Sequence, residues 1–303
     1  MIFLIRLIGR TRMPEGPEVR VIADALNQTI TGHSIVNLSY DTGSRYFKKG
    51  LVGHQRLIDA LPLRINSITT KGKRVIFCLD QDIYLVSFLG MEGHWMFNPE
   101  KHSNLWLDLG SILPTTPRLR ITEHTLFYDD SRHFGFLDIV FGQQALQANL
   151  AHIGPDLLQE VIPLEMWQGV LTRPRLKNKP IGEFLHDQKY FSGIGNYIRA
   201  EILFQTKIHP ERCLGQLSPN EISALLSTSQ QILRASYAHN GHTEYTFFDP
   251  LGRKGTFPVE VYNRTTCPLG HPTTVTYKQK LNRKTGEMEK TGQGMHWCPT
   301  CQH

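Results

Sequence analysis

The chain has 303 residues, of which 40% are hydrophobic and 20% charged, a composition typical of a globular protein with a sizeable core and about two domains. The apolar run over residues 1–8 is far too short to span a bilayer, and it lacks the basic region and the cleavage site of a secretory signal. The formal charge of +6 indicates a polyanionic partner only if it is concentrated in one part of the chain. A membrane protein is therefore excluded, and a DNA-binding protein is not.

The first part of the chain predicts a helix followed by a β-sandwich. Between Glu15 and Ile30 apolar residues recur at helical spacing, and Gly32 ends the run. Short β-type segments separated by turn residues then extend to about Phe141. Six such segments are predicted: 33–40, 63–70, 73–79, 83–90, 124–130 and 134–141.

Beyond Phe141 the pattern becomes helical. Segments 181–188 and 196–205 have helical spacing, and a longer helix begins at Ser218, which is followed by Pro at the first helical position and Glu at the third. Asn240 and Gly241 end that helix. The part from Leu251 onward is rich in Gly, Thr and basic residues.

The C-terminal part carries most of the positive charge and most of the cysteines. From Leu251 to His303 eight basic residues stand against three acidic ones, a net +5 of the total +6. This concentration favours a polyanionic partner, although a solvated charged face is the alternative. Of the five cysteines, Cys78 and Cys213 are isolated and are predicted to be small core residues.

The other three cysteines predict a structural zinc site. Cys267 and His271 flank a short loop, and Cys298 and Cys301 flank another, so a β-hairpin would bring four ligands together around Zn²⁺. His296 and His303 remain alternatives to His271 as the fourth ligand. Three unrelated thiols are the other interpretation, which the short loop within each pair disfavours.

A glycine-rich turn before segment 196–205 predicts an anion site. Gly193 and Gly195 allow a tight turn, and Asn196 is expected to cap the helix, so that backbone N–H groups point outward at its positive end. On its own such a turn is more often a plain helix start. Next to a basic zinc hairpin, a DNA phosphate is the expected ligand.

Several motifs together resemble the formamidopyrimidine-DNA glycosylase and endonuclease VIII family of base-excision repair enzymes. The resemblance starts at Met13, continues to the C-terminus, and keeps the family's motif order, with "LHDQKYFSGIGNY" and the Cys3His finger closer to the endonuclease VIII side. The motifs are "MPEGPE" at 13–18, "TKGK" at 70–73, "FLGMEG" at 88–93, "DDSRHFG" at 129–135, "IGPDLL" at 153–158, "LHDQKYFSGIGNYIRAEILF" at 185–204 and the cysteine cluster.

The resemblance implies a multidomain α+β fold with DNA held between two halves. An N-terminal helix and β-sandwich at 13–141 would form the catalytic domain, followed by a helix-two-turns-helix domain at 142–250. A basic segment and a β-hairpin zinc finger would occupy 251–303. Residues 1–12 would be an extension absent from the active enzyme, either because translation begins at Met13, which is favoured, or because the extension is removed.

The resemblance also implies the catalytic residues. Pro14 would be the nucleophile through a free N-terminal amine, which an amide-bonded proline cannot supply because its lone pair is delocalised. Glu15 would act as general acid and base, and Glu18 would position the nucleophile. Lys73 would bind phosphate near the lesion. Taken alone, acids at a helix start are more often ordinary first-turn residues.

Three further residues would fill the space left when the damaged nucleotide is flipped out of the duplex: Met91, Arg132 and Phe134. Ordinary core packing is the alternative for the two apolar ones, but the flanking glycines favour exposed loop tips. The chain departs from the family at His133 and Gln293, where the family usually has arginine. Lys290 would replace the second arginine as a phosphate ligand, and a lower DNA affinity is the alternative.

The predicted function is thus a bifunctional DNA glycosylase and AP lyase that excises oxidised bases, pyrimidines first, and nicks the strand by β,δ-elimination. Oxidised purines are the alternative substrate, because "GRKGTFPVEVYNR" also resembles the purine-type enzymes. A non-catalytic zinc-finger protein that binds DNA damage is the alternative of another class. The expected protein is a monomer that binds damaged double-stranded DNA and no membrane, nucleoid-associated in the cytoplasm of a bacterium or otherwise nuclear.

Overall fold

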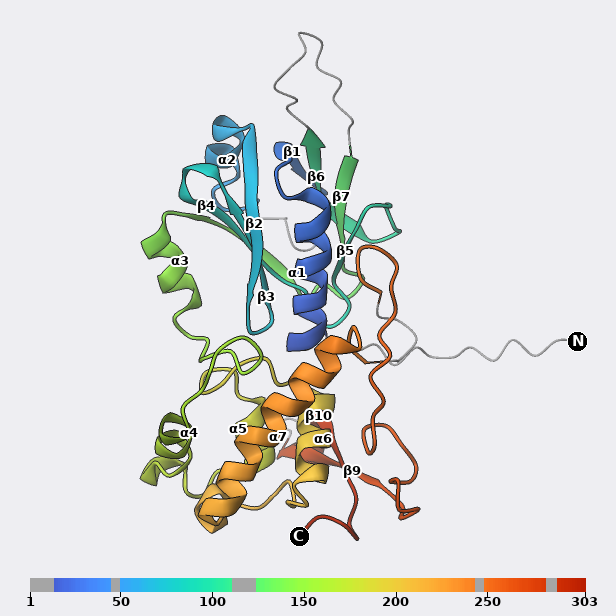
Figure 1. Cartoon of the computed structure of the whole chain (residues 1–303). Helices are drawn as coiled ribbons and strands as arrows, with labels where there is room; N and C mark the ends of the chain where they lie inside the picture. Colours follow the sequence, from blue (N-terminus) through green and yellow to red (C-terminus); the bar gives the residue numbers. More distant parts are fainter. Residues whose placement is uncertain (1–13, 45–49, 111–123, 243–247, 282–287) are drawn as a thin grey trace, which may run out of the picture.

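The computed structural model describes residues 14–44, 50–110, 124–242, 248–281 and 288–303. In Figure 1 the strands and the first helix form the upper half, and the other long helices and a two-stranded ribbon form the lower half. The predicted extension at 1–12 and Met13 lie outside the described residues. Within the described part of the chain, no helix has the length and apolar character to cross a membrane.

The upper half is the predicted helix and β-sandwich. Helix α1 spans Gly16–Ile30. The eight strands run antiparallel to their neighbours in the order β5-β7-β6-β1-β2-β3-β4-β8, and β1 and β2 share just two registered pairs, so the sheet divides there into two layers. The strands are β1 (Ser34–Tyr40), β2 (Leu63–Lys71), β3 (Arg74–Leu79), β4 (Ile83–Phe88), β5 (His94–Met96), β6 (Ser103–Gly110), β7 (His124–Asp129) and β8 (Phe136–Phe141).

One core joins α1 to both layers. The apolar stripe of α1, including Ile22 and Leu26, packs with Leu85 on β4, Trp95 on β5 and Leu107 on β6. The sequence prediction omitted β5, β6 and the short helix α2 (His54–Ala60). Strand β6 carried a usable signal in its alternating buried leucines, whereas β5 is only three residues long and has no detectable period.

The lower half is helical, as predicted. It contains α4 (Leu164–Leu171), α5 (Ile181–His186), α6 (Asn196–Gln205) and α7 (Pro219–Ala238), while α3 (Gln143–Leu150) packs against β8. Ser218 caps α7 and Glu221 completes the capping box, which confirms the predicted start of this helix. The Trp167 indole N–H donates to the Ile222 carbonyl at 2.9 Å and ties α4 to α7.

The C-terminal ribbon consists of β9 (Thr274–Leu281) and β10 (Met288–Trp297). Its base is part of the helical core, since Val261, Cys267 and Cys298 are buried together with the α6 and α7 side chains. The register of β10 shifts between Thr291 and Met295. This bulge faces α6, where the Asn196 side chain donates to the Gly294 carbonyl at 3.0 Å.

Candidate functional site

The two halves meet at the first residue of α1. The Gly16 N–H donates to the Gly193 carbonyl at 2.9 Å, and a Cβ on Gly16 would lie 2.8 Å from the Gly193 Cα. The β2–β3 turn makes a second contact, because the Gly72 N–H donates to Asp156 Oδ2 at 2.8 Å. Glycine is therefore required at this seam for close approach of two backbones.

The carboxylate of Glu15 crosses this seam and lies at the N-terminus of α6. Its Oε1 accepts the Tyr197 N–H at 2.9 Å and its Oε2 accepts the Ile198 N–H at 3.2 Å. Gly195 leaves the space, because a Cβ there would overlap the Glu15 side chain. The positive end of α6 thus stabilises a carboxylate supplied by the other half of the molecule.

The predicted cap of α6 was wrong by one residue. Gly195 is the N-cap, and Asn196 is the first helical residue. Asn196 is 9% exposed, and its side chain bonds to the ribbon instead of capping the helix. An N-cap needs its side chain turned back toward the helix N–H groups, and here Glu15 already bonds to those groups.

Glu15 has the protonation behaviour of an acid that works near neutral pH. It is 3% exposed, and burial raises its pKa to about 7, against the opposing effects of the Lys73 charge and the two α6 N–H donors. Lys73 is 6% exposed, and burial lowers the pKa of its ammonium. A buried carboxyl with such a pKa can both give and take a proton.

Glu18 holds the backbone next to Pro14. Its Oε2 accepts the Glu15 N–H at 3.0 Å, and its Oε1 accepts the Tyr197 hydroxyl at 2.7 Å and the His242 N–H at 2.8 Å. Pro14 itself is buried. Glu18 therefore anchors the Pro14–Glu15 backbone to α6 and to the segment after α7.

Sequence analysis missed Arg199 on α6. The residue is 5% exposed, and its guanidinium donates to the Gly182 carbonyl at 3.2 Å and to Asn196 Oδ1. Burial lowers its pKa to about 10, so it stays charged at neutral pH. Arg199 stands out because the residues around it on α6 are also buried. That pattern becomes visible only when the burial of each residue is known, so the sequence alone did not reveal it.

Arg199 and Lys73 are two buried cations that act on the same neighbours. Burial lowers the pKa of His186 to about 3, and the charges of Lys73 and then Arg199 act in the same direction. His186 Nε2 and Gln293 Oε1 are buried and complete no hydrogen bond within the described residues, although the Gln293 amide is near enough to His186 to affect its pKa. Gln293 therefore lies in surroundings that are already positively charged.

Lys290 lies elsewhere on the ribbon. It is exposed, and its ammonium is 4.9 Å from the centre of the Tyr277 ring. That it replaces the family's arginine at Gln293 stays a prediction. Its role as a DNA ligand on the outside of the ribbon remains a prediction.

Met91, Arg132 and Phe134 come from two loops that touch. A Cβ on Gly90 would lie 2.5 Å from the carbonyl carbon of Phe134, so the loops pack backbone to backbone. Phe134 is 53% exposed, and the Arg132 guanidinium lies 5.0 Å from its ring centre. Core packing of Phe134 is thereby excluded, while Met91 is half-buried. The flanking glycines Gly90, Gly93 and Gly135 are themselves buried, and Gly90 leaves the space for the close approach of the two loops.

Asp130 shapes the Arg132–Phe134 loop from inside. It is fully buried, and its carboxylate accepts the N–H groups of Arg132, His133 and Gly135 at 3.1, 3.0 and 2.8 Å. Three donors on one carboxylate hold the loop backbone rigid while its side chains remain at the surface.

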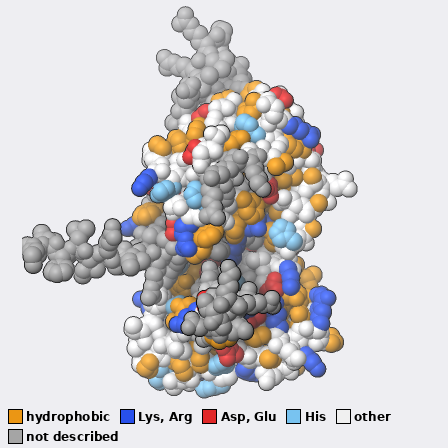
Figure 2. Space-filling view, turned by 180° about the vertical axis from the view of Figure 1, so that it is seen from behind, with side chains coloured by type: hydrophobic (Ala, Val, Ile, Leu, Met, Phe, Trp, Pro, Cys, Tyr) orange, Lys and Arg blue, Asp and Glu red, His pale blue; other side chains and the backbone are white. Residues whose placement is uncertain are grey.

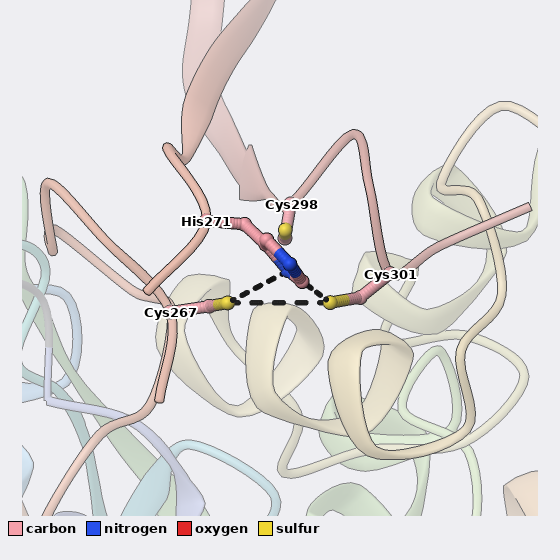
Figure 3. Close-up of side chains that lie close together, drawn as sticks. All are labelled: Cys267, His271, Cys298 and Cys301. Atoms are coloured by element: carbon pink, nitrogen blue, oxygen red, sulfur yellow. Dashed lines mark hydrogen bonds between the residues drawn. The ribbon is translucent and has the colours of Figure 1, made fainter. Parts of the chain in front are cut away.

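The four predicted zinc ligands lie together at the base of the ribbon (Figure 3). All their ligand atoms lie within 4.8 Å of one another, with His271 Nδ1 at 3.3 Å from Cys301 Sγ and at 3.7 Å from Cys267 Sγ. Zn–S bonds of about 2.3 Å and Zn–N bonds of about 2.0 Å fit these separations. The set of Cys267, His271, Cys298 and Cys301 is a closed structural zinc site.

The two other histidines considered as ligands have different partners. His296 Nδ1 accepts the Asn263 N–H at 3.1 Å. His303 is exposed, and its backbone carbonyl accepts the His209 N–H at 2.9 Å. His271 is thus the histidine of the cluster.

Comparisons with known proteins point to one family. Family models match residues 13–137 as a formamidopyrimidine-DNA glycosylase N-terminal domain and residues 153–247 as its H2TH domain. A formamidopyrimidine-DNA glycosylase of Lactococcus lactis is 30% identical over 302 residues, which covers 96% of this chain and 99% of the relative. The Zymomonas mobilis enzyme is 32% identical over 267 residues, or 86% and 93% of the two chains.

Solved structures agree. The complex of Lactococcus lactis Fpg with DNA containing an abasic site matches with a TM-score of 0.77 at 27% identity, over 96% of this chain and all of that one. A complex of the wild-type enzyme with DNA containing an oxidised pyrimidine matches with a TM-score of 0.76 at the same identity and coverage.

Proposed function

The chain belongs to the formamidopyrimidine-DNA glycosylase family, and from this premise we propose that Pro14 and Glu15 carry its chemistry on damaged double-stranded DNA. As a member, it is a bifunctional DNA glycosylase and AP lyase of base-excision repair. The observation that carries the residue assignment is the carboxyl group of Glu15, buried beside Pro14 with its pKa raised to about 7.

Pro14 is the proposed nucleophile. A free proline amine has a pKa of about 8, so part of it is neutral near pH 7.5. Its nitrogen attacks C1′ of the damaged nucleotide as the bond from C1′ to the ring oxygen breaks. The base then leaves C1′ with the bonding electron pair and takes the proton that the amine gives up, so that an iminium ion remains. Elimination then breaks the C3′–O bond and afterwards the C5′–O bond, which releases both phosphates.

Glu15 supplies the proton transfers. In its protonated form it gives a proton to the sugar ring oxygen, which opens the ring as the amine attacks. Its ionised form, stabilised by the N–H groups of Tyr197 and Ile198, can then take the C2′ proton during elimination. The N–H groups at the start of α6 thus bind the Glu15 carboxylate and support its acid and base role, in place of the DNA phosphate predicted from the glycine-rich turn.

The DNA is proposed to lie in the hollow between the two halves. Figure 2 shows the surface hollowed at this level, with Lys and Arg side chains on both sides of it. Lys73 at the seam and Lys290 on the ribbon are the proposed phosphate contacts. Asn196 was predicted to be a third, but its side chain bonds to the Gly294 carbonyl of the ribbon, so its proposed role is to hold the ribbon beside the DNA. Met91, Arg132 and Phe134 are proposed to fill the gap that a flipped nucleotide leaves.

Zinc holds the ribbon in place. Bound to Cys267, His271, Cys298 and Cys301, it would cross-link the two ends of a module that has little core of its own. Because the Gly294 carbonyl bonds to Asn196, this cross-link also fixes the position of the ribbon against α6.

Oxidised bases are the proposed substrates, with formamidopyrimidines and other oxidised purines first. The relatives described above carry the name formamidopyrimidine-DNA glycosylase and not endonuclease VIII, which favours the reverse of the order predicted from sequence. Oxidised pyrimidines are the second candidate, because the Lactococcus lactis enzyme has been crystallised with DNA containing one. We also propose that the enzyme acts as a monomer where chromosomal DNA is found, in a nucleoid or a nucleus.

Trapping with borohydride tests the nucleophile. Protein whose first residue is Pro14 should be reduced onto abasic-site DNA as a covalent adduct, whereas protein that retains residues 1–13 should form none because its proline nitrogen is an amide. Equal trapping by the uncleaved protein would reject Pro14. Binding of lesion DNA without trapping by either form would favour the non-catalytic damage-binding protein.

A further inference from the structure

A second group of metal-ligand side chains lies in the β-sandwich, far along the chain from the cysteine cluster. It consists of His94, Glu100 and Asp129, whose ligand atoms all lie within 4.8 Å of one another. None of the three has a part in the glycosylase chemistry proposed above. One histidine and two carboxylates are a ligand set that divalent first-row transition ions accept.

Backbone pairing places two of these residues side by side. His94 on β5 and Asp129 on β7 are registered partners, and Asp129 also pairs with Ser103 of β6. Directly opposite residues of an antiparallel pair extend their side chains on the same face. The position of these two ligands is therefore set by the sheet and not by flexible loops.

The third ligand comes from the turn before β6. Glu100 is held there by two bonds with Ser103, in which the Ser103 N–H donates to the Glu100 carbonyl at 3.2 Å and the Glu100 N–H donates to Ser103 Oγ at 2.9 Å. Its side chain is 54% exposed, so an ion can enter from solvent.

Hydrogen bonds to neighbouring backbone groups orient His94 and Asp129. His94 Nδ1 lies 2.8 Å from the Glu92 carbonyl oxygen, which can only accept, so Nδ1 carries a proton and Nε2 is the atom directed at the carboxylates. The His102 N–H donates to Asp129 Oδ2 at 2.8 Å. Such bonds from a backbone carbonyl to the ligating histidine and from a donor to the ligating carboxylate are usual around bound metals.

The ligand atoms of the three residues converge on one place. His94 Nε2 lies 3.6 Å from Glu100 Oε2, and Asp129 is 3% exposed. Nε2 of His94 and the oxygens of the two carboxylates thus lie together, with one carboxylate buried and the other open to solvent.

We propose that His94, Glu100 and Asp129 bind a divalent transition-metal ion of the Mn²⁺ or Fe²⁺ class. The ion is separate from the structural zinc, which is held by thiolates that such harder ions do not favour. It would sit beside Glu92, whose carbonyl orients His94 and whose carboxylate contacts Ser131 and lies 3.9 Å from Arg132 Nε. Binding would therefore stiffen the Met91 and Arg132 loops that the proposed function places in the DNA.

Manganese binding to the zinc-loaded full-length protein tests the site. Free Mn²⁺ gives a six-line electron paramagnetic resonance spectrum that is lost on binding, and wild-type protein should bind one equivalent. His94→Ala and Asp129→Asn should each weaken binding at least about tenfold, whereas the exposed His152→Ala should bind as wild type does. Thermal unfolding in the absence of Mn²⁺ identifies any variant that fails to fold.

Hydrogen exchange gives a second measurement. Adding Mn²⁺ should slow amide exchange over residues 91–94 and 129–132 in the wild type and leave it unchanged in His94→Ala. If wild-type protein binds no Mn²⁺, or if His94→Ala binds it equally well, the proposal fails, and His94 is then the cation of a simple ion pair with Glu100. Because borohydride trapping reports on Pro14 alone, this failure leaves the proposed glycosylase chemistry untouched.

Discussion

The Glu15 pocket and the loops of Met91, Arg132 and Phe134 are built on opposite principles. Glu15 is buried at the seam between the halves, its carboxylate bonded to two backbone N–H groups of a helix that begins 181 residues later in the chain. Phe134 is exposed at a loop surface whose backbone is held rigid by the buried carboxylate of Asp130. Burial tunes the pKa of a proton donor, whereas an intercalating side chain must remain free to enter DNA.

The largest expected effect comes from a substitution in the Glu15 pocket. Glu15→Gln should reduce base excision by roughly a hundredfold to ten-thousandfold, because it removes the proton donor but little volume. DNA affinity should change little. Single-turnover excision and equilibrium binding measure the two, and the exposed Glu165→Gln is the matched control. Near-wild-type excision by Glu15→Gln would remove Glu15 from the mechanism.

Loss of zinc should disorder the ribbon, which lies outside both the Glu15 pocket and the exposed loops but contacts α6. His271→Ala should lose metal and most DNA binding, whereas His271→Cys should keep both, because tetrahedral zinc accepts four thiolates. Metal analysis and binding titrations distinguish them. Full zinc retention by His271→Ala would mean that another residue serves as fourth ligand.

The role of the exposed loops is tested by comparing excision from duplex DNA with excision from single-stranded DNA. Met91→Ala and Phe134→Ala should lower excision from duplex DNA about tenfold, on the assumption that each removes stacking worth about 1–3 kcal/mol. Excision from single-stranded DNA should change much less, since no stacked gap forms there. Equal losses on both substrates would show that these side chains support the fold and do not intercalate.

A double-mutant cycle tests the positive surroundings of Gln293. Gln293→Arg alone should not raise DNA affinity, because the new charge would lie among the buried cations Lys73 and Arg199. In an Arg199→Ala background the same substitution should strengthen binding and steepen the salt dependence by about 0.9 in log-log slope, the value for one added phosphate contact. An equal gain in both backgrounds would show that the two arginine positions do not interact.

The smallest expected effect is a shift in pH dependence. Excision needs protonated Glu15, so its rate should fall as pH rises above about 7, the pKa to which burial raises this carboxyl. Lys73 lowers that pKa, so Lys73→Met should move the alkaline limb to higher pH even though the maximal rate drops. Single-turnover rates from pH 5 to 9 measure the limb, and the exposed Lys101→Met should leave it in place. An unmoved limb in Lys73→Met would place the titration on another group.

Local patterns were sufficient for much of the fold. The stripe of α1, the capping box at Ser218 and the two ligand pairs of the zinc site all depend on residues within a few positions of one another, so period and spacing identified them. Short strands without a period, such as β5, gave no signal of their own and form because β7 pairs with them.

Only the tertiary structure decided what surrounds the candidate catalytic residues. "MPEGPE" pointed to Pro14 and Glu15 through family resemblance, but no local pattern indicates that Glu15 bonds to α6 or that Gly195 must lack a Cβ for it to do so. The burial of Arg199, the position of Lys290 on the outside of the ribbon and the meeting of His94 with Asp129 are likewise contacts between distant segments. The sequence by itself determined which chemical groups are present, whereas the pKa and the partners of each group depend on desolvation and long-range packing, which exist only in the folded chain.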